Sequence, residues 1–242
     1  MSITVDKLLS GHAATAGLAT EEIRRPWRHP ISRWYACGIA DRFATLLCDT
    51  PVRPIHLTIC GLLLTFCAAG ILVFLPTATL IAGMLVLTAW LFDRADGQLA
   101  RRQNTMSDFG AWLDANIDEL CDILIHMAVA FAAARLSNST WPWVWLFAFV
   151  AGKYLLVAGL NFEGSSQKAA TEAEQSMAGD GNFGWLKRLY HLPGNADVRL
   201  HLLAAGLLTG YLTLELALIA VYYNFRWMAR YVLVARRLGG AQ

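Results

Sequence analysis

Four aspartates are spaced regularly within residues 93–118, where a long apolar run ends. Asp93 and Asp96 are three residues apart and Asp114 and Asp118 are four apart, so each pair falls on one face of a helix. A carboxylate at the centre of a bilayer costs about 2.5 to 3.5 kcal/mol on insertion scales, so four of them need a function. Two antiparallel helices joined by a short turn would present all four carboxylates to each other.

A cluster of four carboxylates repels itself unless cations neutralise it. Hard oxygen ligands favour Mg²⁺ or Mn²⁺ over zinc, which prefers His or Cys, and the nearby histidine, His126, lies two turns deeper. Gly97, Ala100 and Gly110 remove side-chain bulk where a ligand or another backbone comes close. Two divalent ions at a membrane surface, with the cation of Arg101 beside them, indicate phosphoryl chemistry.

The composition predicts an all-α, polytopic membrane protein. The chain has 242 residues, of which 56% are hydrophobic and 16% charged, and its mean hydropathy is positive. A net charge of +2, with basic residues that do not cluster with aromatic ones, argues against nucleic acid as a partner. The five cysteines form no CxxC pair and lie mostly in apolar segments, so we expect small buried thiols, without disulfides or zinc.

Long apolar stretches predict six transmembrane helices, each compared with the roughly 20 residues that cross a bilayer. The expected spans are residues 54–76, 77–102, 108–135 and 141–162, followed by two helices in 198–238 that meet near residues 210–215. Dividing the last block into two helices places its C-terminal arginines on the cytoplasmic side, in agreement with the positive-inside rule. Asp108 precedes the third span and fits a helix N-cap.

The region before the first span has a different character. Residues 31–50 are apolar but interrupted by charges near helical spacing, which predicts an amphipathic interfacial helix, with a marginal spanning helix as the alternative. No apolar run of signal-peptide length follows the first basic residue, so we expect both termini in the cytoplasm and the chain in the cytoplasmic membrane. The expected domains are a cytoplasmic N-terminus, 1–53, and a six-helix domain, 54–238. A polar connector, 163–197, is the one sizeable soluble loop expected.

The acidic run resembles the signature of the CDP-alcohol phosphotransferases, integral membrane enzymes with six helices. All eight signature positions are filled with acceptable spacing, namely Asp93, Asp96, Gly97, Ala100, Arg101, Gly110, Asp114 and Asp118. Upstream, Pro54 and Thr58 match a Pro-Asn-x-x-Thr segment of many members, while Ile55 replaces the asparagine. The interfacial helix and the segment DVRL, 197–200, are similar to members that act on inositol phosphates.

The resemblance implies a role for each matching residue. It implies that Asp93, Asp96 and Asp114 bind a pair of metal ions, Mg²⁺ or Mn²⁺, which hold the pyrophosphate of a CDP-linked donor. It also implies that Asp118 is the general base for the acceptor hydroxyl and a ligand of the second metal. The residues then expected around the cytidine and its phosphates are Gly97, Ala100, Arg101, Gly110 and Thr58. From spacing alone, Asp114 and Asp118 could exchange roles.

The implied reaction is attack by an acceptor hydroxyl on the donor phosphorus, with CMP as the leaving group, at the cytoplasmic face. CDP-diacylglycerol is the commonest donor in the family, and a soluble CDP-polyol donor stays open. The acceptor would be a hydroxylated compound such as a phosphorylated polyol. We expect a homodimer surrounded by membrane lipid.

Two cations are candidates for binding an anionic acceptor. Lys153 lies inside the fourth span and Arg199 at the cytoplasmic entry of the fifth. Lys153 could instead snorkel or pair with a carboxylate, and Arg199 could be an interfacial anchor.

Two other classes of protein are open alternatives. Intramembrane carboxylates also line the ion paths of transporters, in which a divalent cation or protons would be the cargo. The acids lie at the cytoplasmic ends of two expected helices and not at the midplane, which argues against transport. An inactive member kept as a partner subunit is the third interpretation, and the complete set of aspartates argues against it.

Overall fold

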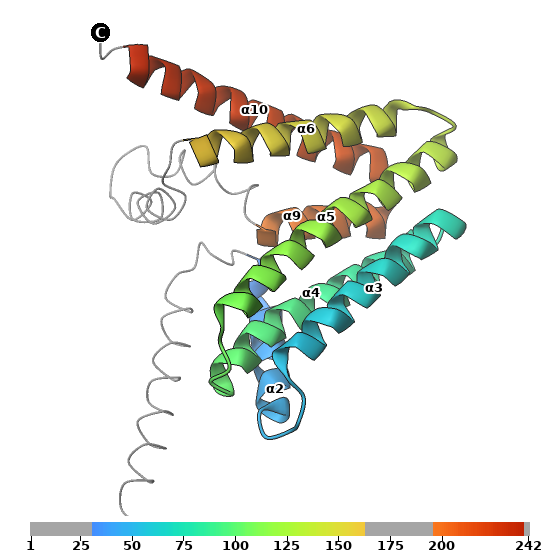
Figure 1. Cartoon of the computed structure of the whole chain (residues 1–242). Coiled ribbons are helices and arrows are strands. Elements are labelled where there is room, and N and C mark those ends of the chain that lie inside the picture. Colours follow the sequence, from blue (N-terminus) through green and yellow to red (C-terminus); the bar gives the residue numbers. More distant parts are fainter. Residues whose placement is uncertain (1–30, 163–195, 240–242) are drawn as a thin grey trace, which may run out of the picture. The chain divides into compact units, whose positions relative to one another are not determined.

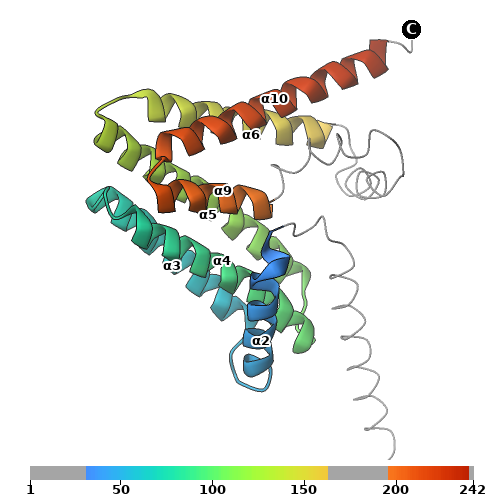
Figure 2. The same ribbon diagram turned by 180° about the vertical axis from the view of Figure 1, so that it is seen from behind.

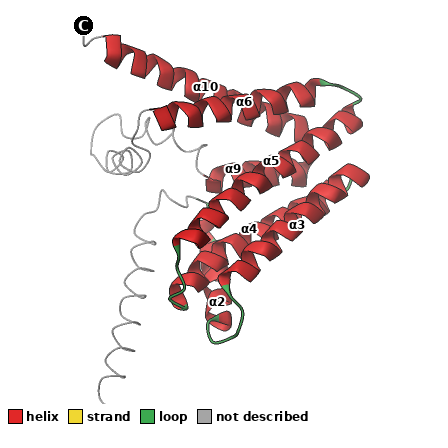
Figure 3. Ribbon diagram, viewed as in Figure 1, coloured by secondary structure: helices red, strands yellow, loops and turns green. Residues whose placement is uncertain are grey.

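The computed structural model of the protein describes residues 31–162 and 196–239. Within these ranges the regular elements are helices, and no strand occurs among them (Figure 3). The elements are the 3-10 turn η1 (Ser32–Trp34) and the helices α2 (Ala36–Leu47), α3 (Pro54–Phe74), α4 (Thr79–Arg102), α5 (Asp108–Ser137), α6 (Trp141–Phe162), α9 (Ala196–Thr209) and α10 (Leu212–Gly239) (Figure 1). The predicted all-α class is confirmed for the described residues. The first 30 residues and most of the predicted connector, 163–195, lie outside them.

Within residues 31–162 and 196–239, three helices are long and apolar enough to cross a membrane. They are α3, α5 and the segment Trp141–Gly159 of α6. Charged residues in the second half of α4 and along α10 shorten their apolar runs, and α9 has 14 residues, so the six-span topology stays a prediction. The expected division of the last apolar block is confirmed, because Gly210, at φ +78°, separates α9 from α10.

Two compact units make up the chain, and each is described by itself. Unit 1 comprises residues 1–68 and 84–122, and unit 2 comprises residues 69–83 and 123–242. The metal-site aspartates predicted from the sequence belong to unit 1. The two predicted acceptor cations belong to unit 2.

In unit 1, helix α2 packs through alanines. Ala36, Ala40 and Ala44 recur every four residues and form one buried stripe. The core beneath this stripe consists of Ala40, Ala44, Leu57, Ala95 and Leu99. An ion pair of 2.5 Å between Asp41 and Arg102 joins α2 to the end of α4 as well. The helix predicted in 31–50 therefore exists, and its location in a membrane interface stays a prediction.

Helices α3 and α4 of unit 1 approach closely at a glycine. A Cβ added to Gly61 would lie 3.2 Å from the backbone oxygen of Ala89, so the missing side chain permits the contact between the two helices. Near the other end of this pair, Nε2 of Gln103 donates a hydrogen bond of 2.8 Å to the carbonyl of Val52, in the segment before α3. These two contacts set the separation of α3 and α4.

The turn between α4 and α5 is short and capped at both ends. Asn104 follows α4 with φ 53°, the left-handed conformation that asparagine tolerates best after glycine. Ser107 caps α5, because its Oγ accepts a hydrogen bond of 3.1 Å from the N–H of Gly110. The expected cap, Asp108, is instead the first residue of α5, where its charge complements the helix dipole.

In unit 2, α6 and α10 pack against each other (Figures 1 and 2). Asn224 of α10 donates a hydrogen bond of 2.7 Å from Nδ2 to the carbonyl of Ala148 on α6, and its Oδ1 accepts one of 3.0 Å from Trp227. Gly152 makes room for this amide, since a Cβ there would lie 2.8 Å from Nδ2. The helix pair is thus fixed beside Lys153.

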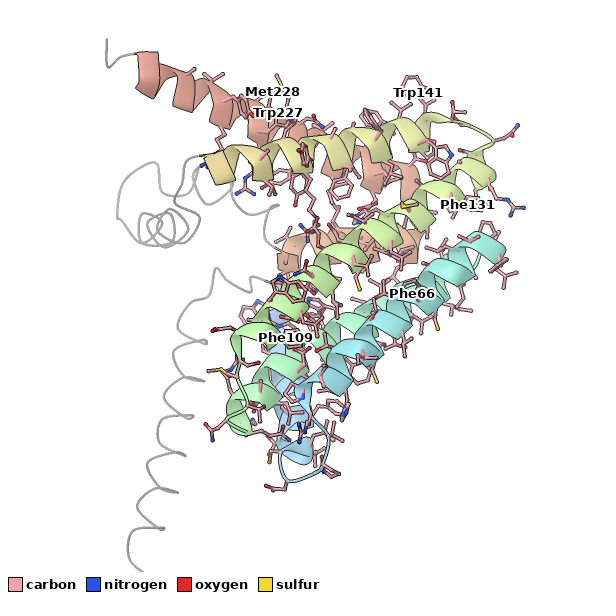
Figure 4. All side chains as sticks on the ribbon, in the orientation of Figure 1. Phe66, Phe109, Phe131, Trp141, Trp227 and Met228 are labelled. Carbon is pink, nitrogen blue, oxygen red and sulfur yellow. The ribbon has the colours of Figure 1, made fainter. Side chains whose placement is uncertain are left out.

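Large apolar side chains stand on the outside of the helices (Figure 4). Phe66 and Phe109 in unit 1, and Trp141 and Met228 in unit 2, are exposed. An apolar surface of this extent is unusual for a protein in water and suits a protein whose solvent is lipid. It agrees with the three helices of spanning length.

Candidate active site

Three carboxylates from two helices of unit 1 meet at one point. Asp93 lies on α4 and Asp114 and Asp118 lie on α5, and one oxygen of each lies within 4.8 Å of the others. Oδ1 of Asp114 is buried and has no hydrogen-bond partner among the described residues. Three carboxylate oxygens this close, one of them without a donor, fit a hard divalent cation such as Mg²⁺ or Mn²⁺. The three residues therefore form a candidate metal centre.

Local helix geometry explains why these three meet. Asp114 and Asp118 are one turn apart on α5, so they share a face. The tight turn after α4 reverses the chain and brings this face toward Asp93. The structure thus brings together three of the four aspartates that we expected to face each other.

The fourth aspartate, Asp96, lies outside this group. Its side chain is 5% exposed, and its Oδ2 accepts a hydrogen bond of 2.5 Å from the hydroxyl of Thr58 on α3. Thr58 also donates to the carbonyl of Pro54, at 3.3 Å. The hydroxyl that engages this carboxylate comes from another helix, 38 residues away in sequence. Thr58, which we expected near the cytidine, contacts a predicted metal ligand.

The remaining residues of the predicted donor site lie near the end of α4 and the start of α5. Arg101 extends back along α4, with Nη1 3.7 Å from the position that a Cβ on Gly97 would take. The carbonyl of Ala100 accepts a hydrogen bond of 3.0 Å from the turn after α4. A Cβ on Gly110 would lie 3.2 Å from Oγ of Ser107. A side chain at Gly110 would therefore crowd the serine hydroxyl, whereas one at Gly97 would meet the guanidinium of Arg101 at an ordinary contact distance.

Lys153 and Arg199, the predicted acceptor residues, are held by aromatic side chains of unit 2. Lys153 is 9% exposed, and its Nζ lies 5.8 Å from the centre of the Phe149 ring. Arg199 is half-buried and donates a hydrogen bond of 2.7 Å from Nη1 to the hydroxyl of Tyr223. Phe149 is one turn before Lys153 on the same helix, α6, whereas the hydrogen bond of Arg199 joins α9 to α10, so interfacial anchoring does not describe the whole role of Arg199.

A buried histidine–glutamate contact in unit 2 was missed by the sequence analysis. Nε2 of His126 lies 3.3 Å from Oε1 of Glu215, and the two side chains are 0% and 1% exposed. The ring of His126 also lies 4.7 Å from that of Phe149. Glu215, an isolated acid in the last apolar block, was the available signal for this contact, because an ionisable residue at membrane depth normally has a partner.

Residues 52–235 match the family model described as CDP-alcohol phosphatidyltransferase. This region covers most of the chain, and the chain therefore belongs to that family, a class of membrane transferases of phospholipid biosynthesis. The three clustered aspartates and Asp96 all lie within the matched region. Membership favours the transferase interpretation of these carboxylates over transport.

Several curated proteins are similar to this chain. A bifunctional IPC transferase and DIPP synthase of Aquifex aeolicus is 25% identical over 210 residues, which are 86% of this chain and 45% of the relative. An archaetidylinositol phosphate synthase of Pyrococcus horikoshii is 33% identical over 90 residues, 37% of this chain and 47% of the relative. A phosphatidylinositol phosphate synthase of Streptomyces avermitilis is 31% identical over 111 residues, 46% of this chain and 45% of the relative. The aligned regions thus cover less than half the length of each of these relatives.

A solved structure shares the fold. The crystal structure of Mycobacterium tuberculosis phosphatidylinositol phosphate synthase with CDP-DAG bound aligns with a TM-score of 0.58 at 20% identity. The alignment covers 82% of this chain and 94% of that one.

Proposed function

We propose that this chain transfers a phosphoalcohol group, in the first instance phosphatidyl, from a CDP-alcohol donor to an acceptor hydroxyl with release of CMP. The convergence of Asp93, Asp114 and Asp118 within the region that matches the family model carries this proposal. Relatives named as inositol phosphate synthases, and a fold relative with CDP-DAG bound, support CDP-diacylglycerol as donor and an inositol phosphate as acceptor.

The acidic residues would hold the cofactor, a pair of Mg²⁺ or Mn²⁺ ions. Asp93, Asp114 and Asp118 offer converging oxygens, and Asp96, oriented by Thr58, adds a fourth carboxylate to the ligand set. Such ions would supply positive charge that offsets the charge on the donor phosphates and on the leaving group.

Asp118 is the proposed general base because it is the most exposed of the three clustered carboxylates and can reach an acceptor that arrives from solvent. The acceptor oxygen bonds to the donor phosphorus, the bond from that phosphorus to the CMP oxygen breaks, and the hydroxyl proton passes to the Asp118 carboxylate. Arg101, whose guanidinium lies beside Gly97, offers a cation to the donor phosphates, and Ala100 and Gly110 complete the proposed donor site.

The proposal extends to the acceptor and to topology. Lys153 and Arg199 bind the anionic group of the acceptor. Six helices span the cytoplasmic membrane of the cell, both termini and the active site face the cytoplasm, and α2 lies in the interface. Two copies form a homodimer. A measurement of the protein's mass in detergent tests this.

The experiment that tests the reaction is CMP release by the purified full chain in detergent with Mg²⁺. CDP-diacylglycerol is offered with inositol phosphate, glycerol phosphate, serine or free inositol. We expect CMP with a phosphorylated acceptor and its loss in Asp118→Asn, whereas Asp49→Asn, an exposed aspartate outside the site, stays active. If the protein binds Mg²⁺ but neither binds CDP-diacylglycerol nor releases CMP, the proposal is overturned and transport is favoured.

A further inference from the structure

Phe149 and Tyr223 form a buried aromatic pair that joins two helices of unit 2. Phe149 on α6 is 0% exposed and Tyr223 on α10 is 4% exposed. Their ring centres are 5.4 Å apart and the planes make an angle of 61°, a favourable edge-to-face arrangement. This pair lies next to the contact of Asn224 with Ala148 and Gly152, which fixes α6 against α10.

Each ring of the pair holds one cation. The Tyr223 hydroxyl accepts the hydrogen bond of 2.7 Å from Arg199, which comes from a third helix, α9. The face of Phe149 lies 5.8 Å from Nζ of Lys153, within the range of a cation–π interaction. The two cations, 46 residues apart in sequence, are therefore connected through two rings that touch.

The Phe149 ring has buried contacts on its other side. The His126 ring lies 4.7 Å from the Phe149 ring, and Glu215 of α10 contacts His126 in turn. Asp197 and Glu215 are the acidic residues in the described part of unit 2, and each lies within 3.5 Å of a histidine nitrogen, on His201 and His126 respectively. Both acids in the described part of this unit thus have contacts to histidines.

We propose that Tyr223 and Phe149 are positioning residues that orient Arg199 and Lys153 together toward the phosphomonoester of a phosphorylated acceptor. This inference rests on the proposed function. A planar guanidinium recognises phosphate only in certain directions, so the hydrogen bond that fixes its orientation raises affinity for phosphate. The pair selects a phosphorylated polyol over its unphosphorylated form.

The variant that isolates this role is Tyr223→Phe, which deletes one hydroxyl and keeps the ring against Phe149. We expect the KM for inositol phosphate to rise on the order of tenfold, because the variant loses a hydrogen bond to a charged group. The kcat and the KM for CDP-diacylglycerol should stay within about twofold of the wild type. A purely structural role would instead lower the thermal midpoint or kcat and leave the KM for the acceptor unchanged.

The matched control is Tyr222→Phe, on the same helix. The Tyr222 hydroxyl also accepts a hydrogen bond from an arginine, Arg226, at 2.8 Å, and its ring also contacts Tyr223. We expect this variant to keep the KM of the wild type. Equal changes in the two variants would contradict the proposal.

A double-mutant cycle decides the proposal even if Tyr223→Phe lowers stability. In an Arg199→Gln background, Tyr223→Phe should raise the acceptor KM by less than about twofold further, because the group on which it acts is gone. Additive effects would overturn the inference while the proposed function stands. If the wild type releases no CMP with any phosphorylated acceptor, the proposed function itself fails.

Discussion

The hydroxyl of Thr58 on α3 donates a hydrogen bond of 2.5 Å to Oδ2 of Asp96 on α4. This bond joins two helices and engages one oxygen of a carboxylate that is almost completely buried. A carboxylate that accepts such a bond is oriented before a cation arrives, and groups of this kind commonly change metal affinity when they are removed.

Replacement of Thr58 therefore tests whether Asp96 belongs to the metal centre. We expect Thr58→Val to raise the Mg²⁺ concentration for half-maximal CMP release by about 10- to 100-fold, because it keeps the shape and deletes the donor. Thr58→Ser keeps the hydroxyl and should stay close to the wild type. Equal Mg²⁺ titrations for the two variants would show that the hydrogen bond serves only packing.

Asp114 and Asp118 are predicted to differ in kinetics, although their spacing leaves their roles interchangeable. Asp118→Asn should lower kcat by roughly 10²- to 10⁴-fold, the usual contribution of a general base, and this loss should remain at saturating Mg²⁺. Asp114→Asn, which removes a buried carboxylate oxygen without a donor, should shift the Mg²⁺ titration. Measuring CMP release against Mg²⁺ for both variants separates the roles, and the reverse pattern would exchange the two assignments.

The contact between His126 and Glu215 predicts that the stability losses caused by replacing each residue are not additive. Glu215→Met alone leaves a buried imidazole without its carboxylate and should cost about 1–3 kcal/mol, seen as a lower thermal midpoint in detergent. His126→Leu alone should have a similar effect. The double variant should lose less than the sum of the two, because neither group is then left without the other. Additive losses would mean that the two groups do not interact.

Gly152 is predicted to be intolerant of a side chain. Gly152→Ala places a Cβ 2.8 Å from Nδ2 and 3.0 Å from the backbone nitrogen of Asn224, so α6 and α10 must separate. We expect a loss of about 1–3 kcal/mol in thermal unfolding in detergent. Gly70→Ala, on α3, meets nothing within 4 Å and serves as the control, with unchanged or slightly higher stability. A Gly152→Ala protein as stable as this control would contradict the close packing.

Much of the fold could be predicted from sequence, because hydropathy and the residues that start and end helices are local signals. The helices of 54–76, 77–102, 108–135 and 141–162 start and end within a few residues of their expected bounds. The break at Gly210 followed from the charges of the last block. The predicted cap of α5 was wrong by one residue, because Ser107 and Asp108 are adjacent and both residue types fit an N-cap.

The candidate site could be predicted only where its geometry is helical. The convergence of Asp93, Asp114 and Asp118 follows from helix periodicity and one tight turn. The partner of Asp96 could not be predicted this way, because α3 reaches it from another part of the chain. The same holds for the ring of Tyr223 near Arg199, since no local pattern links a tyrosine of α10 to an arginine of α9.

The absent side chain of Gly61 has a consequence for how this site can vary. Gly61 lies one turn beyond Thr58 on the same face of α3, where an added Cβ would lie 3.2 Å from a backbone oxygen of α4. Even one methyl group there would push α3 outward and lengthen the reach from Thr58 to Asp96. A library of random substitutions selected for activity should therefore recover glycine at position 61 as strictly as aspartate at position 96, although Gly61 has no side chain with which to bind a ligand.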